Sequence, residues 1–196
     1  MNQSTSVFYL VSLKRSLTEL DVAFNTSIDD DAISALVCLL KLRFLTLLDT
    51  RVGMPGLRRL CAAIAQRPYA VELEVPRQCE IYIDSKIGIL LYGAHALTRD
   101  VEMGSKYVLH PEAPLISDPN AVSNLTSNAL KHNLAAHSQY NSSISVEGTQ
   151  DEMVERLRTL LETRRADMLV RQVLWKEDED EDRNDDDSSE SSIEVF

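Results

Sequence analysis

The chain has 196 residues, 44% of them hydrophobic, which is enough for one ordinary domain together with a small module. Its formal net charge of −11 is uneven, because residues 177–196 carry eleven carboxylates against one arginine and the remainder is nearly neutral. An aromatic content of 6% argues against a base-stacking or sugar-binding surface, three unpatterned cysteines argue against a disulfide framework, and no apolar stretch approaches the roughly 18 residues of a membrane helix.

Two segments early in the chain repeat one pattern of apolar residues at a spacing of 25 residues. In both Leu17–Asn25 and Leu42–Thr50, leucine occupies the first and fourth positions and an apolar residue the sixth. Each is followed by apolar residues at helical spacing, over Ile33–Leu40 and Leu57–Ile64. Residues typical of helix N-termini precede both stripes, namely Asp29–Asp31 and Pro55. The pattern predicts strand, loop and helix in that order, twice.

Residues 17–64 resemble leucine-rich repeats, specifically the longer type with an outer α-helix found in ribonuclease-inhibitor-like and F-box-associated repeats. The resemblance implies a solenoid of parallel strands backed by helices, in which each unit buries its apolar face against its neighbours. Leu20 and Leu45 would then lie side by side on adjacent parallel strands.

A degraded third unit follows at Ala70–Val75, where apolar and acidic residues alternate as in a strand. Beyond it, Glu80–Ile83 and Lys86–Tyr92 also have the composition of short strands. We therefore expect residues 69–104 to cap the solenoid at its C-terminal end.

A second resemblance lies beyond the proline-containing residues 105–122, which predict a linker. Gly148–Leu157 is similar to the second half of a SAP module, a helix–extended loop–helix unit that binds nucleic acid in many chromatin and RNA-processing proteins. Gln150 departs from that pattern, because the family generally has a phosphate-binding lysine there. The residues that follow the SAP order are Gly148, Thr149, Met153, Val154, Arg156 and Leu157.

The predicted fold class is α/β, with four segments in chain order. Residues 1–104 form a short leucine-rich repeat solenoid with its cap, residues 105–122 a linker, residues 123–176 a helical SAP-like module, and residues 177–196 a disordered acidic tail. The tail is expected above all to keep the chain soluble. Docking onto basic proteins and competition with nucleic acid for the basic residues of the body are the alternatives.

Alternate residues of the predicted strands face the concave side of the solenoid and form a candidate surface for a protein partner. A large apolar pair, Phe44 and Leu48, lies there between acidic flanks, which is typical of a protein-binding patch unless another part of the chain folds over it. The candidate partner-binding residues are Glu19, Asp21, Phe44, Thr46, Leu48, Glu72 and Glu74.

The SAP-like segment offers a candidate nucleic-acid surface, since phosphates are bound chiefly by lysine and arginine. Five basic residues are matched there by five acidic ones, so we expect weak and salt-dependent binding. The basic residues are Lys131, Arg156, Arg158, Arg164 and Arg165.

No catalytic triad, phosphate-binding loop or metal-ligand spacing occurs in the sequence. We therefore expect an intracellular protein, nuclear or cytoplasmic, that is not an enzyme and needs no cofactor, metal, membrane or small-molecule substrate. The first hypothesis is an adaptor that recognises another protein on the concave repeat face. A role as the substrate-recognition part of a larger complex is one form of this hypothesis. The alternative is a nuclear protein that binds nucleic acid or chromatin through the SAP-like module.

Overall fold

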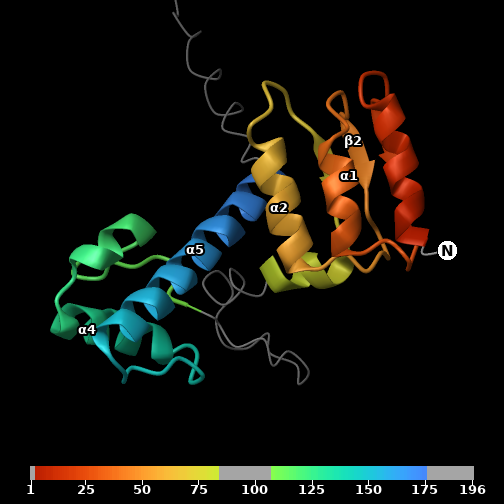
Figure 1. The fold of residues 1–196 in the computed structure, drawn as a ribbon. Helices are drawn as coiled ribbons and strands as arrows, with labels where there is room; N and C mark the ends of the chain where they lie inside the picture. The colour runs from red at the N-terminus through yellow and green to blue at the C-terminus, as the bar shows by residue number, and fades with distance from the viewer. Residues whose placement is uncertain (1–2, 84–106, 176–196) are drawn as a thin grey trace, which may run out of the picture.

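Three short parallel strands lie at the centre of the N-terminal half in the computed structural model, which describes residues 3–83 and 107–175 (Figure 1). They are β1 (Glu19–Asp21), β2 (Phe44–Thr46) and β3 (Glu72–Glu74), in the order β1-β2-β3. The register pairs Leu20 with Leu45 and Leu45 with Leu73. The predicted neighbours Leu20 and Leu45 are therefore adjacent on parallel strands.

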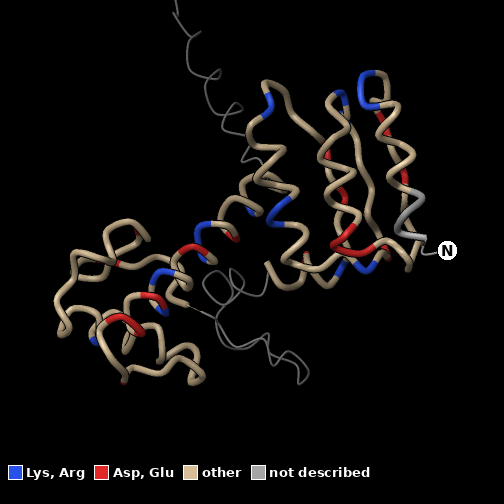
Figure 2. Tube along the Cα trace, viewed as in Figure 1, with Lys and Arg blue, Asp and Glu red and all other residues tan. Residues whose placement is uncertain are grey.

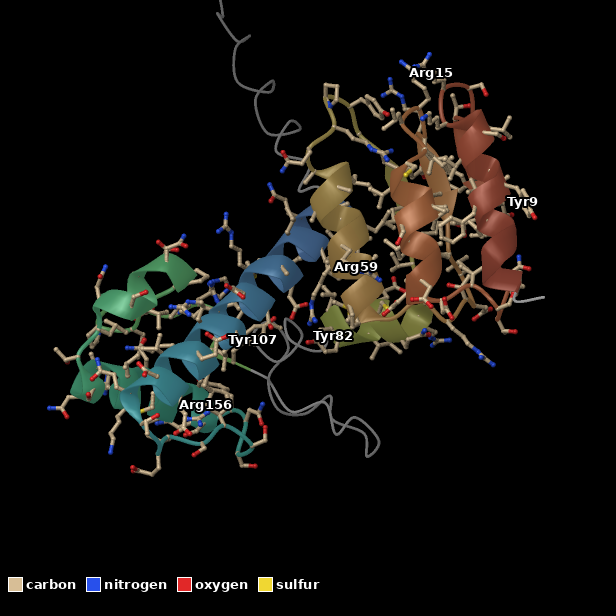
Figure 3. All side chains as sticks on the ribbon, in the orientation of Figure 1. Tyr9, Arg15, Arg59, Tyr82, Tyr107 and Arg156 are labelled. Carbon is tan, nitrogen blue, oxygen red and sulfur yellow. The ribbon has the colours of Figure 1, made fainter. Side chains whose placement is uncertain are left out.

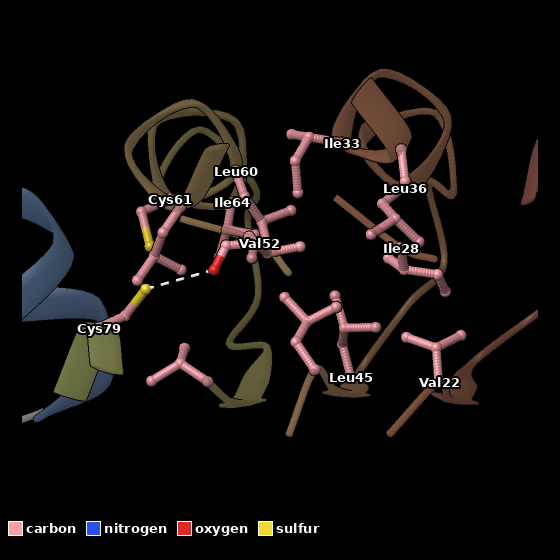
Figure 4. Packing of buried hydrophobic residues seen from close by; sticks show 14 of the residues in the cluster. Val22, Ile28, Ile33, Leu36, Leu45, Val52, Leu60, Cys61, Ile64 and Cys79 are labelled. Carbon is pink, nitrogen blue, oxygen red and sulfur yellow. Dashed lines mark hydrogen bonds between the residues drawn. The ribbon is translucent and has the colours of Figure 1, made fainter. Parts of the chain in front are cut away.

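Helices cover one face of this sheet and lie side by side in the order of the chain (Figure 1). They are η1 (Gln3–Leu13), η2 (Asp30–Ala32), α1 (Ile33–Val37) and α2 (Met54–Ile64). The first buried core lies between these helices and the strands, and Figure 4 shows its residues from close by. Leu36, Leu45, Leu57 and Leu60 are each no more than 1% exposed, so the apolar stripes of the helices meet the strand leucines as their spacing predicts.

Both predicted helix starts have the expected geometry. The Asp29 carboxylate accepts a hydrogen bond of 3.1 Å from the backbone of Asp31, and Pro55 lies in the first turn of α2. The Asp30 carboxylate accepts a hydrogen bond of 2.8 Å from the backbone N–H of Gly53, which ties the beginning of α2 to the preceding unit. A Cβ at Gly56 would lie 2.2 Å from the same carboxylate, so only glycine fits there.

The turns that follow β1 and β2 have the same local geometry. Asn25 Nδ2 donates to the carbonyl of Val22 at 3.1 Å, and Thr50 Oγ1 donates to the carbonyl of Leu47 at 2.8 Å. In each turn the residue directly before the donor has a positive φ, which is 60° at Phe24 and 52° at Asp49. These bonds close each turn on itself and do not link one unit to the next.

The predicted fold class, a leucine-rich repeat solenoid, is wrong. Helices make up 52% of the structure and strands 6%, and the small three-stranded sheet ends at β3. No further unit follows β3 in the described residues, because Pro76 begins a helical turn and residues 77–83 are helical. The expected strand at Glu80–Ile83 is therefore also wrong. The expected strand at Lys86–Tyr92 and the acidic tail lie outside the described residues.

The C-terminal half is helical and has a core of its own. It contains η4 (Pro119–Asn124), α4 (Ser127–Ser138) and α5 (Gln150–Leu174). The buried residues of this core are Val122, Leu130, Leu134, Met153, Leu157 and Leu161. Part of the predicted linker belongs to the folded structure, since Tyr107, Pro119 and Val122 are buried.

Helix α5 joins the two halves, because its first part packs in the second core and Val170 near its end packs in the first. Asp167 lies between them at 3% exposure. Its carboxylate accepts hydrogen bonds from Arg58 Nε at 2.7 Å, from the Tyr82 hydroxyl at 3.2 Å and from the Tyr107 hydroxyl. Figure 3 shows Tyr82 and Tyr107 where the two halves meet. This buried cluster fixes α5 against α2.

We predict that Asp167→Ala lowers the free energy of unfolding by about 3 kcal/mol, because it leaves the partly buried Arg58 without its counter-ion. The loss is measured by the shift of the urea midpoint. Glu162→Ala is the matched control, since Glu162 is an exposed carboxylate on the same helix, and its effect should stay within about 0.5 kcal/mol. Equal shifts for the two variants would contradict the structural role of the cluster.

Candidate protein-interaction surface

The sheet brings six of the seven predicted partner-binding residues into two rows across its outer side. The first row is Glu19, Phe44 and Glu72, and the second is Asp21, Thr46 and Glu74, paired residue by residue in the register of the strands. We call these six residues the strand face. Each row places a carboxylate on either side of an uncharged residue, and adjacent strands are about 4.8 Å apart.

The carboxylates of the strand face are exposed and have no ionic partner among the described residues. Glu19, Asp21, Glu72 and Glu74 are all exposed, and none forms an ion pair within the described parts of the chain. Asp21 accepts one hydrogen bond, of 2.8 Å, from the backbone N–H of Ala23 in the following turn. Four like charges on one small surface repel each other, so a cation that bound there would relieve the repulsion.

The uncharged residues of this surface differ in their accessibility. Phe44 is half-buried and does not pack against either hydrophobic core, and Leu48 is 37% exposed just beyond the second row. Thr46 was predicted to bind a partner, but it is only 4% exposed and its hydroxyl accepts a hydrogen bond from the backbone of Leu48. Thr46 is therefore a structural residue, while Phe44 and Leu48 are accessible apolar groups.

A cavity of about 320 Å³ adjoins the strand face where the strands end. Glu74 and Glu80 contribute carboxylates to its lining, Leu48 and Leu174 contribute apolar groups, and Trp175 closes it after the end of α5. The acidic and apolar character of the strand face thus continues around the edge of the sheet.

The predicted nucleic-acid residues are, in contrast, mostly committed within the fold. Lys131 is paired with Glu147 at 3.0 Å and Arg158 with Glu155 at 2.9 Å. The structure uses Arg156 to hold the loop before α5, through hydrogen bonds to the carbonyls of Ser145 and Glu147. Arg164 Nε donates to the carbonyl of Leu109 at 2.7 Å, and burial lowers its pKa. Arg165 is exposed, and no contact of its side chain is recorded in the described chain.

The SAP-like residues have clear structural roles at the start of α5. Gly148 has a φ of +141°, and a Cβ there would lie 2.7 Å from the Glu152 carboxylate. Thr149 caps the helix in a reciprocal arrangement with Glu152. Gln150, at the position of the family's lysine, accepts a hydrogen bond of 2.8 Å from the Ser127 hydroxyl and so joins the beginnings of α4 and α5. Each of these roles stabilises the helix pair without a ligand.

His137 is fully buried in α4 and is the most perturbed histidine of the described chain. Its Nδ1 accepts a hydrogen bond of 2.8 Å from the backbone N–H of Val108, so the neutral ring carries its proton on Nε2, which has no partner among the described residues. Burial lowers the pKa of His137 to about 4, and the nearby charge of Arg164 contributes. The imidazole is therefore neutral in the folded protein at neutral pH.

No pattern in the sequence predicts the Asp167 cluster, because its members are separated by up to 109 residues. Burial, followed by the charge of Asp167, raises the pKa of both Tyr82 and Tyr107, so both hydroxyls stay protonated and donate. Burial lowers the pKa of Arg58, but Asp167 outweighs this effect and the pKa is raised overall. The cluster is thus an anion with three donors, which suits a structural contact.

A second cavity, of about 550 Å³, lies beside α5 and is lined by Tyr107, Ile144, Arg156 and Leu160 together with other polar residues, but by no histidine or cysteine. The described chain contains no group of three or more histidine, cysteine or acidic residues arranged to hold a metal ion. Among the same residues, no helix combines the length and apolar character needed to cross a membrane.

No protein-family model matches the chain, and no curated protein or solved structure is significantly similar to it. The strand face is therefore interpreted from its own residues. On it, four exposed carboxylates lie beside the accessible apolar groups of Phe44 and Leu48.

We predict that the free energy of unfolding falls by about 3 kcal/mol between pH 7 and pH 4 through His137 alone. The unfolded chain takes up a proton near the ordinary pKa of 6.5, whereas folded His137 takes it up only near pH 4, so acidification favours the unfolded state. Urea unfolding over this pH range measures the slope. His137→Gln keeps an acceptor for Val108 and should remove about that much of the decrease. An unchanged slope in this variant would contradict the prediction.

Proposed function

We propose that this chain is a non-enzymatic protein-interaction adaptor that binds a basic segment of a partner protein on the strand face. The observation that carries the proposal is a set of four exposed carboxylates without an ion pair in the described residues, two of which flank Phe44 while the other two flank Thr46. Asp21 also accepts a hydrogen bond from the following turn, but no ion pair inside the described parts of the chain engages any of the four.

The arrangement of the rows indicates the shape of the partner segment. Glu19 and Glu72 lie two strands apart, which corresponds to about 10 Å, with Phe44 between them. A segment that crosses the strands with lysine or arginine on both sides of an apolar side chain would match the first row. Asp21 and Glu74 offer a second pair of carboxylates one step further along the strands.

The two kinds of contact would contribute differently to binding. Exposed ion pairs contribute about 0.2–1 kcal/mol each and mainly accelerate association, and salt weakens them. Apolar contact with Phe44 and Leu48 contributes about 25 cal/mol per Å² of buried surface and depends little on salt. The cavity lined by Glu74, Glu80 and Trp175 extends the same chemistry beyond the rows.

The alternative function, nucleic-acid binding through the SAP-like module, has less support. Four of its five candidate basic residues are engaged in ion pairs or in hydrogen bonds to backbone carbonyls. These contacts compete with a phosphate for the same cations.

We predict that Glu19→Lys/Glu72→Lys weakens the binding of a basic probe about tenfold at low salt, because two attractive charges become repulsive. The probe is a short fluorescein-labelled peptide that alternates arginine and leucine, and fluorescence anisotropy measures its dissociation constant. Phe44→Ala should weaken binding severalfold, and this loss should persist at about 0.5 M NaCl, where exposed ion pairs are screened.

Glu112→Lys/Glu162→Lys is the matched control, since it makes the same change of charge at two exposed carboxylates outside the strand face. Residues 177–187 are the same in all these variants and the change of net charge is the same in the two pairs, so the difference between the pairs reports on where the charges are reversed. Equal weakening by both pairs would overturn the proposal.

A further inference from the structure

The turns that lead into the three strands form one continuous edge of the N-terminal half. The backbone N–H of Leu40 donates to the carbonyl of Lys14 at 3.0 Å, which joins the first turn to the second. The Arg67 guanidinium donates to the carbonyl of Val37 at 3.2 Å, and the Tyr69 hydroxyl donates to that of Leu40, which joins the third turn to the second. The side chains on these turns are therefore held close to one another.

The three turns themselves carry positive charge alone, and the first acidic residues, Glu19 and Glu72, come where β1 and β3 begin. Residues 7–18, 37–48 and 64–71, which contain the three turns, include no aspartate or glutamate. We call the exposed cations of the edge, Lys14, Arg15, Lys41 and Arg43, the basic edge. Figure 2 shows the blue segments of these turns at one end of the N-terminal half, and Figure 3 labels Arg15 among them.

The basic edge differs from the basic residues of the C-terminal half because its cations are not committed. Lys14, Arg15 and Lys41 form no ion pair or side-chain hydrogen bond within the described residues. Arg43 stacks on the Tyr69 ring at 3.8 Å, which orients the guanidinium and leaves its charge without a counter-ion in the described chain. Four like charges held together favour an anionic occupant.

We propose that the basic edge is the docking surface for the chain's own acidic segment, residues 177–187. This segment carries nine carboxylates and one arginine, so its charge is complementary to that of the edge. The proposal concerns a different surface from the strand face and does not depend on the function proposed above. The strand face itself would repel the segment, since it bears four carboxylates.

The geometry of the described chain allows this contact. Trp175, after which the segment soon begins, lines a cavity together with Val75, just beyond the end of β3. The basic edge lies at the other end of the same strands, and Val71 to Val75 corresponds to about 13 Å of strand. An extended chain spans about 3.3 Å or more per residue, so residues 177–187 are long enough to reach the edge and to lie along it.

Attachment to the same chain also favours this occupant over an external one. A tethered segment has an effective concentration in the millimolar range when its tether spans the distance. An acidic partner or a nucleic acid at micromolar concentration would have to displace it. In addition, Arg43 covers one face of the Tyr69 ring, which reduces the aromatic surface of the third turn on which a base could stack.

Zero-length carbodiimide crosslinking of the full chain tests the proposal, because the reagent joins a carboxylate only to an amine that contacts it. Mass spectrometry should find residues 177–187 linked to Lys14 or Lys41 in the monomer. The Lys131–Glu147 pair, at 3.0 Å, is the internal reference for a stable contact. The links to Lys14 and Lys41 should decrease at least fivefold at about 0.5 M NaCl, where exposed charges are screened.

Arg15→Ala/Arg43→Ala leaves both reactive lysines in place and should reduce these links about fivefold, while Arg15→Lys/Arg43→Lys should retain them. The Lys131–Glu147 link should be unchanged in both variants, which verifies that the chain is folded. A mixture of isotope-labelled and unlabelled chains separates links within one chain from links between two copies. Links that join two copies, that form equally with Lys131, or that persist in the alanine variant would each overturn the proposal.

Discussion

The buried carboxylate of Asp167 is the contact on which the arrangement of the two halves depends. It lies on α5, and its three donors come from α2, from the helical residues 77–83 and from the segment that enters the C-terminal half. Removing a charge from water is costly unless hydrogen bonds replace the lost hydration, and here three donors do so. The cluster therefore specifies one position of α5 beside the sheet, packed against α2 and β3.

Local features could be predicted from the sequence because they depend on residues close together in the chain. The constant spacing of the two leucine patterns predicted the adjacency of Leu20 and Leu45, and Asp29 and Pro55 marked helix starts. The fold class was predicted wrongly, because Glu80–Ile83 has the composition of a strand, whereas residues 77–83 are helical and the sheet stops before Pro76. The outer side of the strands was assigned correctly for the acidic residues and for Phe44, but Thr46 is buried by its neighbours. The members of the Asp167 cluster share no local sequence pattern. The basic edge does have one, because lysine or arginine follows each helical segment and no aspartate or glutamate lies between them.

Acidic and basic residues lie on separate surfaces of the N-terminal half, which the net charge of the chain does not show. The strand face is acidic and the turns that lead into the same strands are basic, although the chain before residue 177 is nearly neutral. Opposite charges this close usually form ion pairs, yet none is found between these two surfaces in the described residues. Both surfaces therefore keep their charge available for binding. We assign a basic partner segment to the strand face and the acidic residues 177–187 to the basic edge.

Helix α5 has a consequence for how the molecule comes apart. It contributes Met153, Leu157 and Leu161 to one core and Val170 to the other, with no proline or glycine between them. A helix of about a dozen residues is marginal in water without tertiary support, so neither half of α5 would persist after its core had melted. The boundary between the two halves runs through the middle of a helix, and thermal melting is expected to be one cooperative event in spite of two separate cores.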